Sequence, residues 1–333
     1  MMIREYLKLA RSFNAVLTGV SPVMGAIAMG YFDIPILFVL FLIGFFGHTY
    51  GFVLNDIIDY NIDKSSKEIS DRPLISGTIS IKKAWIFAIL SMAISFALSF
   101  YISFTTSSYF PILILAISAI FVTLYDLISK KIPGTDIILA IGVFFLVLYG
   151  AATVKNSIDI SQLAWIVCIL GGTQVLYMNA IAAGLKDIEN DYNKGANTLA
   201  VKLGVRVTDS KLKMSTSFKT LAFAIQIIDL IVVLLPFFII WKLESLQYAQ
   251  LAIIVFIGII MLVLSNRLLS MKTFDRMRAR KLIGSHYMIN FMIVPIMLMT
   301  VNTWAGILII FPGLGFILSN LILHGTLLQP KTM

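Results

Sequence analysis

An acidic cluster stands directly after a long apolar run near the N-terminus, where carboxylates are costly unless something compensates their charge. The cluster contains Asn55, Asp56, Asp59 and Asp63. At about 100° per residue, its three aspartates fall within about 60° of one another on a helix and share one face. Carboxylates grouped in this way repel one another. A hard cation bound among their oxygens would relieve the repulsion, with the Asn55 oxygen as a further ligand.

A second acidic cluster has the same setting, at the end of a later apolar run. It contains Lys186, Asp187 and Asp191, and its two aspartates lie about 40° apart on a helix. Mg²⁺ typically takes one or two carboxylates together with phosphate oxygens of a substrate and waters. Two facing clusters of this kind predict Mg²⁺ ions bridged by a diphosphate, rather than solvated carboxylates paired with neighbouring lysines.

A diphosphate also needs cations that are not metal ions, and basic residues stand near both clusters. Arg72 follows Asp63 by nine residues, Lys130 closes the fourth apolar run, and Lys186 opens the second cluster. Arginine suits bidentate contact with phosphate. Arg11, at the start of the first apolar run, is a further candidate, although basic residues on one side of a membrane also orient a protein whatever their chemistry.

The composition indicates an all-α, polytopic membrane protein. Of the 333 residues, 59% are hydrophobic and 13% are charged, whereas a soluble domain carries roughly 25% charged residues. A membrane-spanning helix needs about 20 apolar residues. We expect about nine, possibly ten, such helices in a single domain over residues 1–333. The apolar runs lie at about 13–32, 34–54, 84–103, 109–126, 135–154, 162–185, 218–241, 248–270, 282–301 and, after a break at Asn302, 303–323.

The basic residues predict the orientation of the chain in the membrane. With ten spans, 24 of the 26 Lys and Arg residues fall on one side, and only Lys155 and Lys242 fall on the other. The positive-inside rule then places the N-terminus and both acidic clusters in the cytoplasm, with the chain integral to the cell membrane. Nucleic-acid binding is a poor explanation of the net charge of +9, because the basic residues are divided among connecting loops.

The motifs resemble those of the UbiA-type intramembrane prenyltransferases over most of the chain. Residues 55–63 match the first motif of that family, NDxxDxxxD, without departure. Residues 71–77, DRPLISG, are similar to its DRPxxSG segment, and Tyr125 with Lys130 resembles the end of its fourth helix. Residues 187–199 are similar to its second aspartate motif.

Two positions depart from the family pattern. Arg11-x-x-Asn14 resembles the family's RPxN, but Ser12 replaces the proline, and Asn197 stands where a basic residue often precedes Thr-Leu. These departures affect the assignment to a subfamily and leave the expected metal ligands unchanged.

The resemblance implies a fold, a reaction and roles for individual residues. It implies a helical bundle around a central cavity, capped by the two cytoplasmic aspartate loops, and Mg²⁺-dependent transfer of a polyprenyl group from its diphosphate to an acceptor in the membrane. Asp56, Asp59 and Asp63, assisted by Asn55, would bind one Mg²⁺, and Asp187 and Asp191 another. The expected substrate-binding residues are Asn14, Asn55, Arg72, Tyr125, Lys130 and Lys186, with Asn14 and Tyr125 near the reacting carbon or the acceptor.

Other classes of protein fit the sequence less well. A transporter that uses intramembrane acids would carry carboxylates near the middle of its spans, and only Asp229 has that position. The differently spaced motif of the CDP-alcohol phosphotransferases is absent from the sequence. A soluble prenyl diphosphate synthase conflicts with the composition.

The acceptor stays open among several chemical classes. The candidates are 4-hydroxybenzoate, a dihydroxynaphthoate, homogentisate, haem, a chlorophyllide and a geranylgeranylglyceryl phosphate. The opening at residues 11–14 and the segment at 71–77 favour a quinone-precursor aromatic or the glyceryl phosphate.

Overall fold

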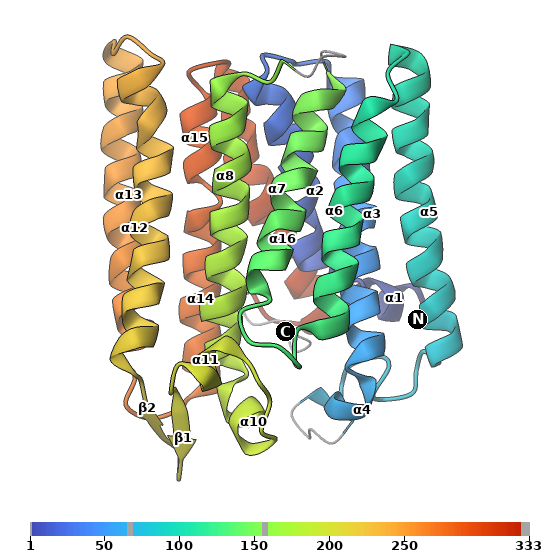
Figure 1. The fold of residues 1–333 in the computed structure, drawn as a ribbon, viewed down its shortest axis with the longest axis vertical. Helices are drawn as coiled ribbons and strands as arrows, with labels where there is room; N and C mark the ends of the chain where they lie inside the picture. Colours follow the sequence, from blue (N-terminus) through green and yellow to red (C-terminus); the bar gives the residue numbers. More distant parts are fainter. Residues whose placement is uncertain (1, 65–68, 155–158, 328–333) are drawn as a thin grey trace.

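The computed structural model describes residues 2–64, 69–154 and 159–327, and its long helices run side by side as a bundle (Figure 1). The long helices are α2 (Ser12–Ala28), α3 (Ile34–Ile58), α5 (Ile81–Thr106), α6 (Phe110–Ile128), α7 (Asp136–Thr153), α8 (Gln162–Leu176), α12 (Thr216–Ile239), α13 (Ser245–Leu269), α14 (Arg276–Asn290) and α16 (Ile307–His324).

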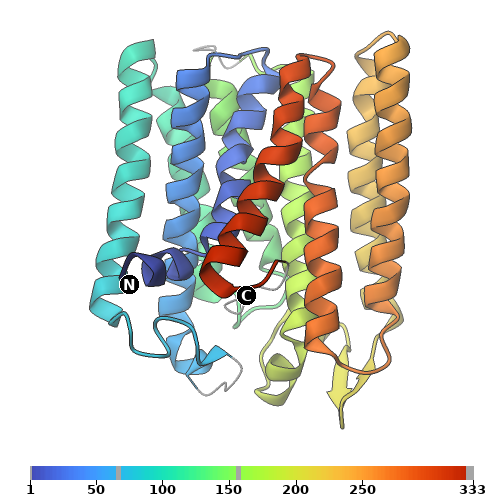
Figure 2. The same cartoon turned by 180° about the vertical axis from the view of Figure 1, so that it is seen from behind.

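The short elements gather mainly at one end of the bundle, the lower end in Figure 1, where both termini also lie. There α1 lies across the direction of the long helices (Figure 2), and β1 pairs antiparallel with β2, with Val207 opposite Leu212. The short elements are α1 (Met2–Leu9), α4 (Tyr60–Asp63), the π-helix η2 (Tyr177–Ala183), α9 (Gly184–Lys186), α10 (Ile188–Asn193), α11 (Leu199–Lys202), β1 (Arg206–Thr208), β2 (Lys211–Lys213), α15 (Ile293–Leu298) and the 3₁₀ helix η3 (Thr303–Gly306).

The predicted membrane spans are confirmed. Within the described residues, nine helical stretches are long and apolar enough to cross a membrane, and α2 is a shorter apolar helix of 17 residues. The stretch after Asn302 is a separate span, because α16 runs back to the end of the bundle where α1 lies (Figure 2).

The connections follow the expected alternation between the two ends of the bundle. The segments after α3, α6 and α8 lie at the lower end in Figure 1, and the α12–α13 connection with Lys242 lies at the opposite end. Lys155 and Lys331, which also entered the prediction of orientation, lie outside the described residues.

Serine residues set the start of several spans. Ser80, Ser161 and Ser215 precede α5, α8 and α12, and each side chain accepts a hydrogen bond from the backbone N–H three residues later. Such caps satisfy one of the backbone donors that a helix leaves unpaired at its N-terminus. The helix ends are therefore encoded locally.

Glycine brings α2 and α7 together in the middle of the bundle. A Cβ atom added to Gly150 would lie 1.8 Å from the Pro22 carbonyl oxygen, and one added to Gly25 would lie 2.1 Å from the Val147 carbonyl oxygen. Small residues allow this kind of close backbone approach between membrane helices. Large apolar side chains, such as Phe100 on α5, face outward instead.

Candidate active site

A cavity of about 340 Å³ lies inside the bundle, between helices α2, α3, α5, α6, α7 and the segment from α8 to α10. Its lining changes in character along the bundle axis. The end near α4 and α10 is charged, whereas Met92, Phe96, Leu115 and Leu146 line the part deeper between the helices. The cavity therefore joins a polar mouth to an apolar interior.

The first acidic cluster continues the helical path of α3. Although α3 ends at Ile58, the Asp59 N–H donates to the Asn55 carbonyl at 2.9 Å, and the Asp63 N–H donates to the Asp59 carbonyl at 2.9 Å. This repeat of bonds four residues apart keeps the carboxylates of the cluster near one another, as the spacing in the sequence predicts.

Two arginines form ion pairs with Asp56 and Asp63 of the first cluster. Arg72 Nη1 lies 2.5 Å from Asp63 Oδ2 and 3.5 Å from Asp56 Oδ1, and Arg11 Nη2 lies 2.7 Å from the same Asp56 oxygen. All four side chains are buried. Burial alone would lower the pKa of Arg72, but Asp56 and Asp63 outweigh that effect and raise the pKa above its ordinary value.

Lys130 neutralises the side of the cluster that faces the cavity. Its Nζ lies 2.9 Å from Asp59 Oδ2 and 3.3 Å from Asp63 Oδ1. Burial raises the pKa of Asp59, and the Lys130 ammonium opposes that rise. For Lys130, burial lowers the pKa, but Asp59 and Asp63 reverse the effect and hold the pKa above its ordinary value.

Arg11 reaches the cluster through an unusual backbone conformation. At the break between α1 and α2, its φ of 45° and ψ of 49° lie in the left-handed region, which a non-glycine residue rarely adopts. Such positions persist where the surroundings enforce them, often at functional sites. Here the ion pair with Asp56 and the Phe52 ring, whose centroid lies 4.8 Å from Arg11 Cζ, hold the side chain in place.

The second acidic cluster follows the π-helix η2 and forms the opposite wall of the mouth. The Asp191 N–H donates to the Asp187 carbonyl at 3.0 Å, so the two residues lie one helical turn apart. Asp187 forms ion pairs with Lys186 Nζ at 3.3 Å and with Arg276 Nη2 at 2.9 Å. Arg276 comes from α14 and also lines the cavity.

The two aspartates of this second cluster differ in their titration. Burial would raise the pKa of Asp187, but Lys186 and Arg72 hold it below its ordinary value. For Asp191, burial and the nearby Asp187 carboxylate raise the pKa to about 7. A cation near Asp191 would therefore find a carboxyl group that is easily stripped of its proton at neutral pH.

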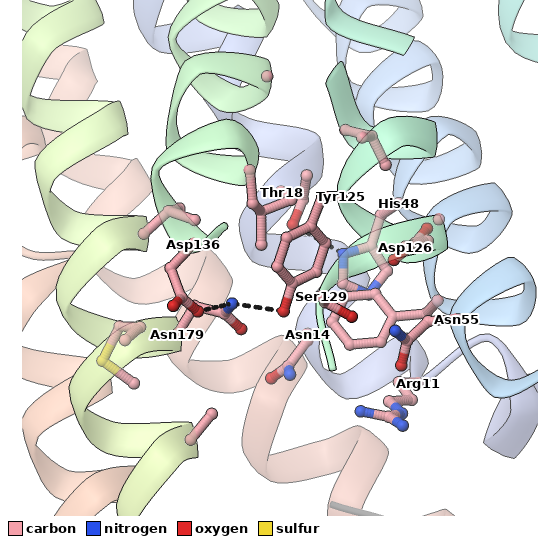
Figure 3. A pocket seen from close by; sticks show the side chains of 18 of the residues that line it. Arg11, Asn14, Thr18, His48, Asn55, Tyr125, Asp126, Ser129, Asp136 and Asn179 are labelled. Carbon is pink, nitrogen blue, oxygen red and sulfur yellow. Dashed lines mark hydrogen bonds between the residues drawn. The ribbon is translucent and has the colours of Figure 1, made fainter. Parts of the chain in front are cut away.

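A chain of hydrogen bonds crosses the cavity behind the mouth (Figure 3). Asn179 Nδ2 donates to the Tyr125 hydroxyl at 2.6 Å and to Asp136 Oδ1 at 2.7 Å. Asn14 lines the same region, and Asn55 donates a hydrogen bond to Asp126. The polar groups of this layer come from α2, α3, α6, α7 and η2.

The structure brings nearly all predicted site residues to the cavity. The predicted residues that line it are Asn14, Asn55, Asp59, Asp63, Arg72, Tyr125, Lys130, Lys186, Asp187 and Asp191. Asp56 is the exception, because it lies behind them and both arginines engage its Oδ1 atom.

Sequence reasoning missed several polar residues of the site. Among those with a charged or amide side chain are Asp126, Asp136, Asn179 and Arg276. Asp126 and Asp136 carried a usable signal, since each is an acid at the border of an apolar run. Asn179 and Arg276 carried none, because neither belongs to an acidic cluster.

Asp229, the other intramembrane acid in the sequence, lies away from the cavity. Its Oδ1 accepts a hydrogen bond from Thr173 Oγ1 at 2.6 Å, which joins α12 to α8. It is not among the cavity-lining residues that the structure describes. The contact that the structure shows for it is therefore one between two helices.

The donor atoms at the mouth fit Mg²⁺, since Asp59, Asp63, Asp187 and Asp191 carry carboxylate oxygens and Asn55 carries an amide oxygen. Across the described parts of the chain, no group of three or more His, Cys, Asp or Glu side chains converges closely enough to enclose a metal ion. A Mg²⁺ ion here would take a few carboxylate oxygens and complete its shell with substrate oxygens and water.

Comparisons with known proteins identify the family of the chain. The family model described as the UbiA prenyltransferase family matches residues 15–291. The digeranylgeranylglyceryl phosphate synthase of Methanocaldococcus jannaschii is 27% identical over 249 residues, which cover 74% of this chain and 79% of that protein.

Two solved structures share the fold. The apo structure of a UbiA homologue from Aeropyrum pernix K1 has a TM-score of 0.68 at 15% identity, and covers 87% of this chain and 98% of its own. A UbiA homologue from Archaeoglobus fulgidus bound to GPP and Mg²⁺ has a TM-score of 0.63 at 15% identity, with 87% and 99% covered. The family match spans most of the chain, and the protein therefore belongs to the UbiA prenyltransferase family, whose members are membrane enzymes that transfer prenyl groups.

Proposed function

We propose that this enzyme transfers a polyprenyl group from its diphosphate to a glyceryl phosphate acceptor in the membrane, with Mg²⁺ as cofactor. The observation that carries the proposal is the cavity itself. Two acidic clusters and their basic partners form its mouth, and apolar side chains line its interior. A substrate with a diphosphate head and a hydrocarbon tail matches both parts.

The metal would be held between the two clusters. Asp59 and Asp63 on one wall and Asp187 and Asp191 on the other are the proposed ligands, with Asn55 assisting. When bound, Mg²⁺ neutralises the charge that develops on the departing diphosphate. Asp56 remains a predicted ligand, although it would first have to exchange its contacts with Arg11 and Arg72 for the ion.

The basic residues are proposed to bind the diphosphate. Arg72 and Lys130 are bound to cluster carboxylates in the free enzyme. A metal ion that takes over those carboxylates would release the two cations toward the phosphate oxygens. Lys186, on the opposite wall, would contribute a third positive charge. Their combined effect is to stabilise the leaving group as the allylic C–O bond breaks.

The buried part of the cavity is proposed to exclude water from the allylic cation. Tyr125 and Asn14 line this part of the site. A closed, low-dielectric environment prevents the cation from being quenched before the acceptor attacks. The apolar walls beyond it would receive the prenyl tail.

The relatives favour the glyceryl phosphate as the acceptor. The M. jannaschii relative and a Thermococcus gammatolerans relative, 30% identical over 211 residues, are both named digeranylgeranylglyceryl phosphate synthase. A phosphorylated acceptor also needs positive charge of its own, and Arg276 lies at the mouth on the side of the second cluster. An aromatic quinone precursor is the second candidate, because the motifs of the sequence are compatible with it.

We further propose that the chain is one domain, with its N-terminus and both aspartate loops in the cytoplasm. The concentration of basic residues in the connections at the mouth end of the bundle supports this orientation. Labelling of single cysteines introduced at residues 64 and 242 would test it. Reagents added from outside are expected to reach only residue 242.

The function is tested with purified protein in detergent, a labelled geranylgeranyl diphosphate and Mg²⁺. The acceptors are geranylgeranylglyceryl phosphate, 4-hydroxybenzoate, dihydroxynaphthoate and homogentisate, each supplied separately. We expect a labelled product with the glyceryl phosphate that disappears when EDTA is added. A product with an aromatic acceptor alone would overturn the acceptor assignment, and no product with any acceptor would overturn the proposed reaction.

A further inference from the structure

The hydrogen-bonded chain Tyr125–Asn179–Asp136 has no role in binding the diphosphate, yet three separate helical elements, α6, η2 and α7, contribute to it. All three side chains line the cavity. Figure 3 shows Asn179 between the tyrosine ring and the carboxylate. This arrangement places a carboxylate within the reaction chamber.

Asp136 differs from the carboxylates of the first cluster in having no basic partner. Among the described residues it forms no ion pair, whereas Asp56, Asp59 and Asp63 each contact Arg or Lys. Its negative charge is supported in another way, because it occupies the first turn of α7, where the helix dipole favours an anion. The Asn179 amide donates to it as well.

An irregular stretch of helix places Asn179 next to Asp136. Asn179 lies in the seven-residue π-helix η2, which interrupts the span that begins with α8. Such π-helical segments are rare and occur frequently at functional sites. The same amide nitrogen donates to Tyr125, so that hydroxyl and Asp136 are held at a fixed separation.

The transfer reaction requires a group of this kind. When the acceptor oxygen attacks the allylic carbon, its hydroxyl proton must be removed. The three carboxylates of the first cluster and Asp187 form ion pairs with basic side chains, and Asp191 belongs to the proposed metal site, whereas Asp136 has neither commitment among the residues that the structure describes. It is half-buried and faces the cavity, so an acceptor hydroxyl can approach it without the carboxylate first breaking an ion pair.

We propose that Asp136 is the catalytic residue that takes the proton from the acceptor, and that Asn179 positions its carboxylate. The bond from the allylic carbon to the diphosphate oxygen breaks, and its electron pair leaves with the diphosphate. A bond forms between the acceptor oxygen and the allylic carbon, and the hydroxyl proton passes to Asp136. This inference rests on the proposed function, since it presumes an acceptor that loses a proton.

The test compares Asp136→Asn with wild type on two readouts. The first is kcat with whichever acceptor wild type uses. The second is ionisation of the donor, measured as movement of an isotopically labelled bridging oxygen into the other positions of the donor diphosphate. Asp229→Asn is the matched control, because it makes the same change at a buried carboxylate outside the cavity.

We expect Asp136→Asn to lower kcat by about 10²- to 10⁴-fold, the usual contribution of a general base. Donor ionisation should continue, and Asp136→Glu should restore part of kcat because it returns the carboxylate. Unchanged kcat in Asp136→Asn would overturn the inference. Loss of donor ionisation together with kcat would also overturn it, because Asp136 would then serve the diphosphate site.

The two proposals fail in different ways. If wild type forms no product with any acceptor, the proposed function fails before the kcat of the variant is compared with that of wild type. If wild type forms product and Asp136→Asn forms it equally fast, only the role of Asp136 fails. Asn179→Ala adds an intermediate case, in which kcat should fall less than in Asp136→Asn while the KM for the donor is retained.

Discussion

The two acidic clusters are built from the same residue type at the same cavity mouth, but their environments differ. In the first, Arg11, Arg72 and Lys130 engage the carboxylates, and every one of those carboxylates is buried. In the second, the Asp187 side chain is 34% exposed. Asp191 there forms no ion pair with any residue that the structure describes.

Because of this difference, we expect the two clusters to contribute differently to binding the metal ion and the diphosphate. The charges of the first cluster are already balanced by basic side chains, so a metal ion that binds there must displace them. In the second cluster the Asp187 carboxylate is partly exposed, and the Asp191 pKa of about 7 reflects burial and repulsion by Asp187, which Lys130 and Lys186 offset only in part. We therefore expect an incoming metal ion to bind more readily at the second cluster. The first cluster holds more of the basic side chains that could bind the diphosphate.

Within the comparison of the two clusters, the largest effect should come from removing one carboxylate charge from either of them. Asp59→Asn and Asp187→Asn should each lower kcat by about 10²- to 10³-fold, because each removes charge stabilisation from the departing diphosphate. Steady-state kinetics with Mg²⁺ measures the loss. If one variant kept full activity while remaining folded, the donor would not bridge the two clusters as the account requires.

The next largest effect is on the free energy of unfolding, which should differ between variants of the two clusters. Arg72→Met should lower the free energy of unfolding by about 3 kcal/mol, because it leaves buried carboxylates without their partner. Arg276→Met should cost about 1 kcal/mol or less, because solvent screens the partly exposed Asp187. Thermal unfolding in detergent measures both. Equal losses would contradict the distinction between a closed and an open cluster.

A smaller effect on kcat/KM is expected from filling the apolar part of the cavity, beyond the two clusters. Gly47 lines the cavity, and a Cβ atom there would meet only Ser95 Oγ, at 3.9 Å. Gly47→Leu should lower kcat/KM for a geranylgeranyl donor by about 10-fold relative to a dimethylallyl donor, since the added side chain occupies space for the tail. Gly47→Ala is the control that fits. An equal loss for both donors would place the tail elsewhere.

The smallest effect is expected at Asp229. Asp229→Asn keeps the hydrogen bond with Thr173 possible and should change stability by less than about 1 kcal/mol. Its kcat should equal that of wild type. A loss of activity here would show that an acid outside the cavity takes part in the reaction.

Local patterns in the sequence predicted the parts of the site that depend on neighbours along the chain. The apolar runs gave the spans, and the four-residue spacing of Asp59 and Asp63 placed them on one helical path. Arg72 was predicted to bind the diphosphate from its place nine residues after Asp63, and the structure pairs it with Asp63. The spacing of Asp59 and Asp63 was informative because the backbone there follows a regular helical path.

The parts that the sequence did not predict depend on contacts between distant segments or on irregular backbone. Arg276 meets Asp187 across 89 residues, and helix packing rather than spacing sets that distance. Asn179 reaches Tyr125 and Asp136 from within a π-helix, which has no dependable signature in a single sequence. Arg11 was visible as a cation, but its left-handed backbone and its contact with Asp56 were not.

The most direct test of the central claim is Mg²⁺-dependent binding of a non-reactive thio analogue of geranylgeranyl diphosphate to wild type, Asp59→Asn and Asp187→Asn. Calorimetry would report the affinity of the analogue at several Mg²⁺ concentrations. We expect tight binding to wild type that requires Mg²⁺ and weakens strongly in both variants. Binding that is independent of Mg²⁺, or unchanged in both variants, would contradict a diphosphate site between the two acidic clusters.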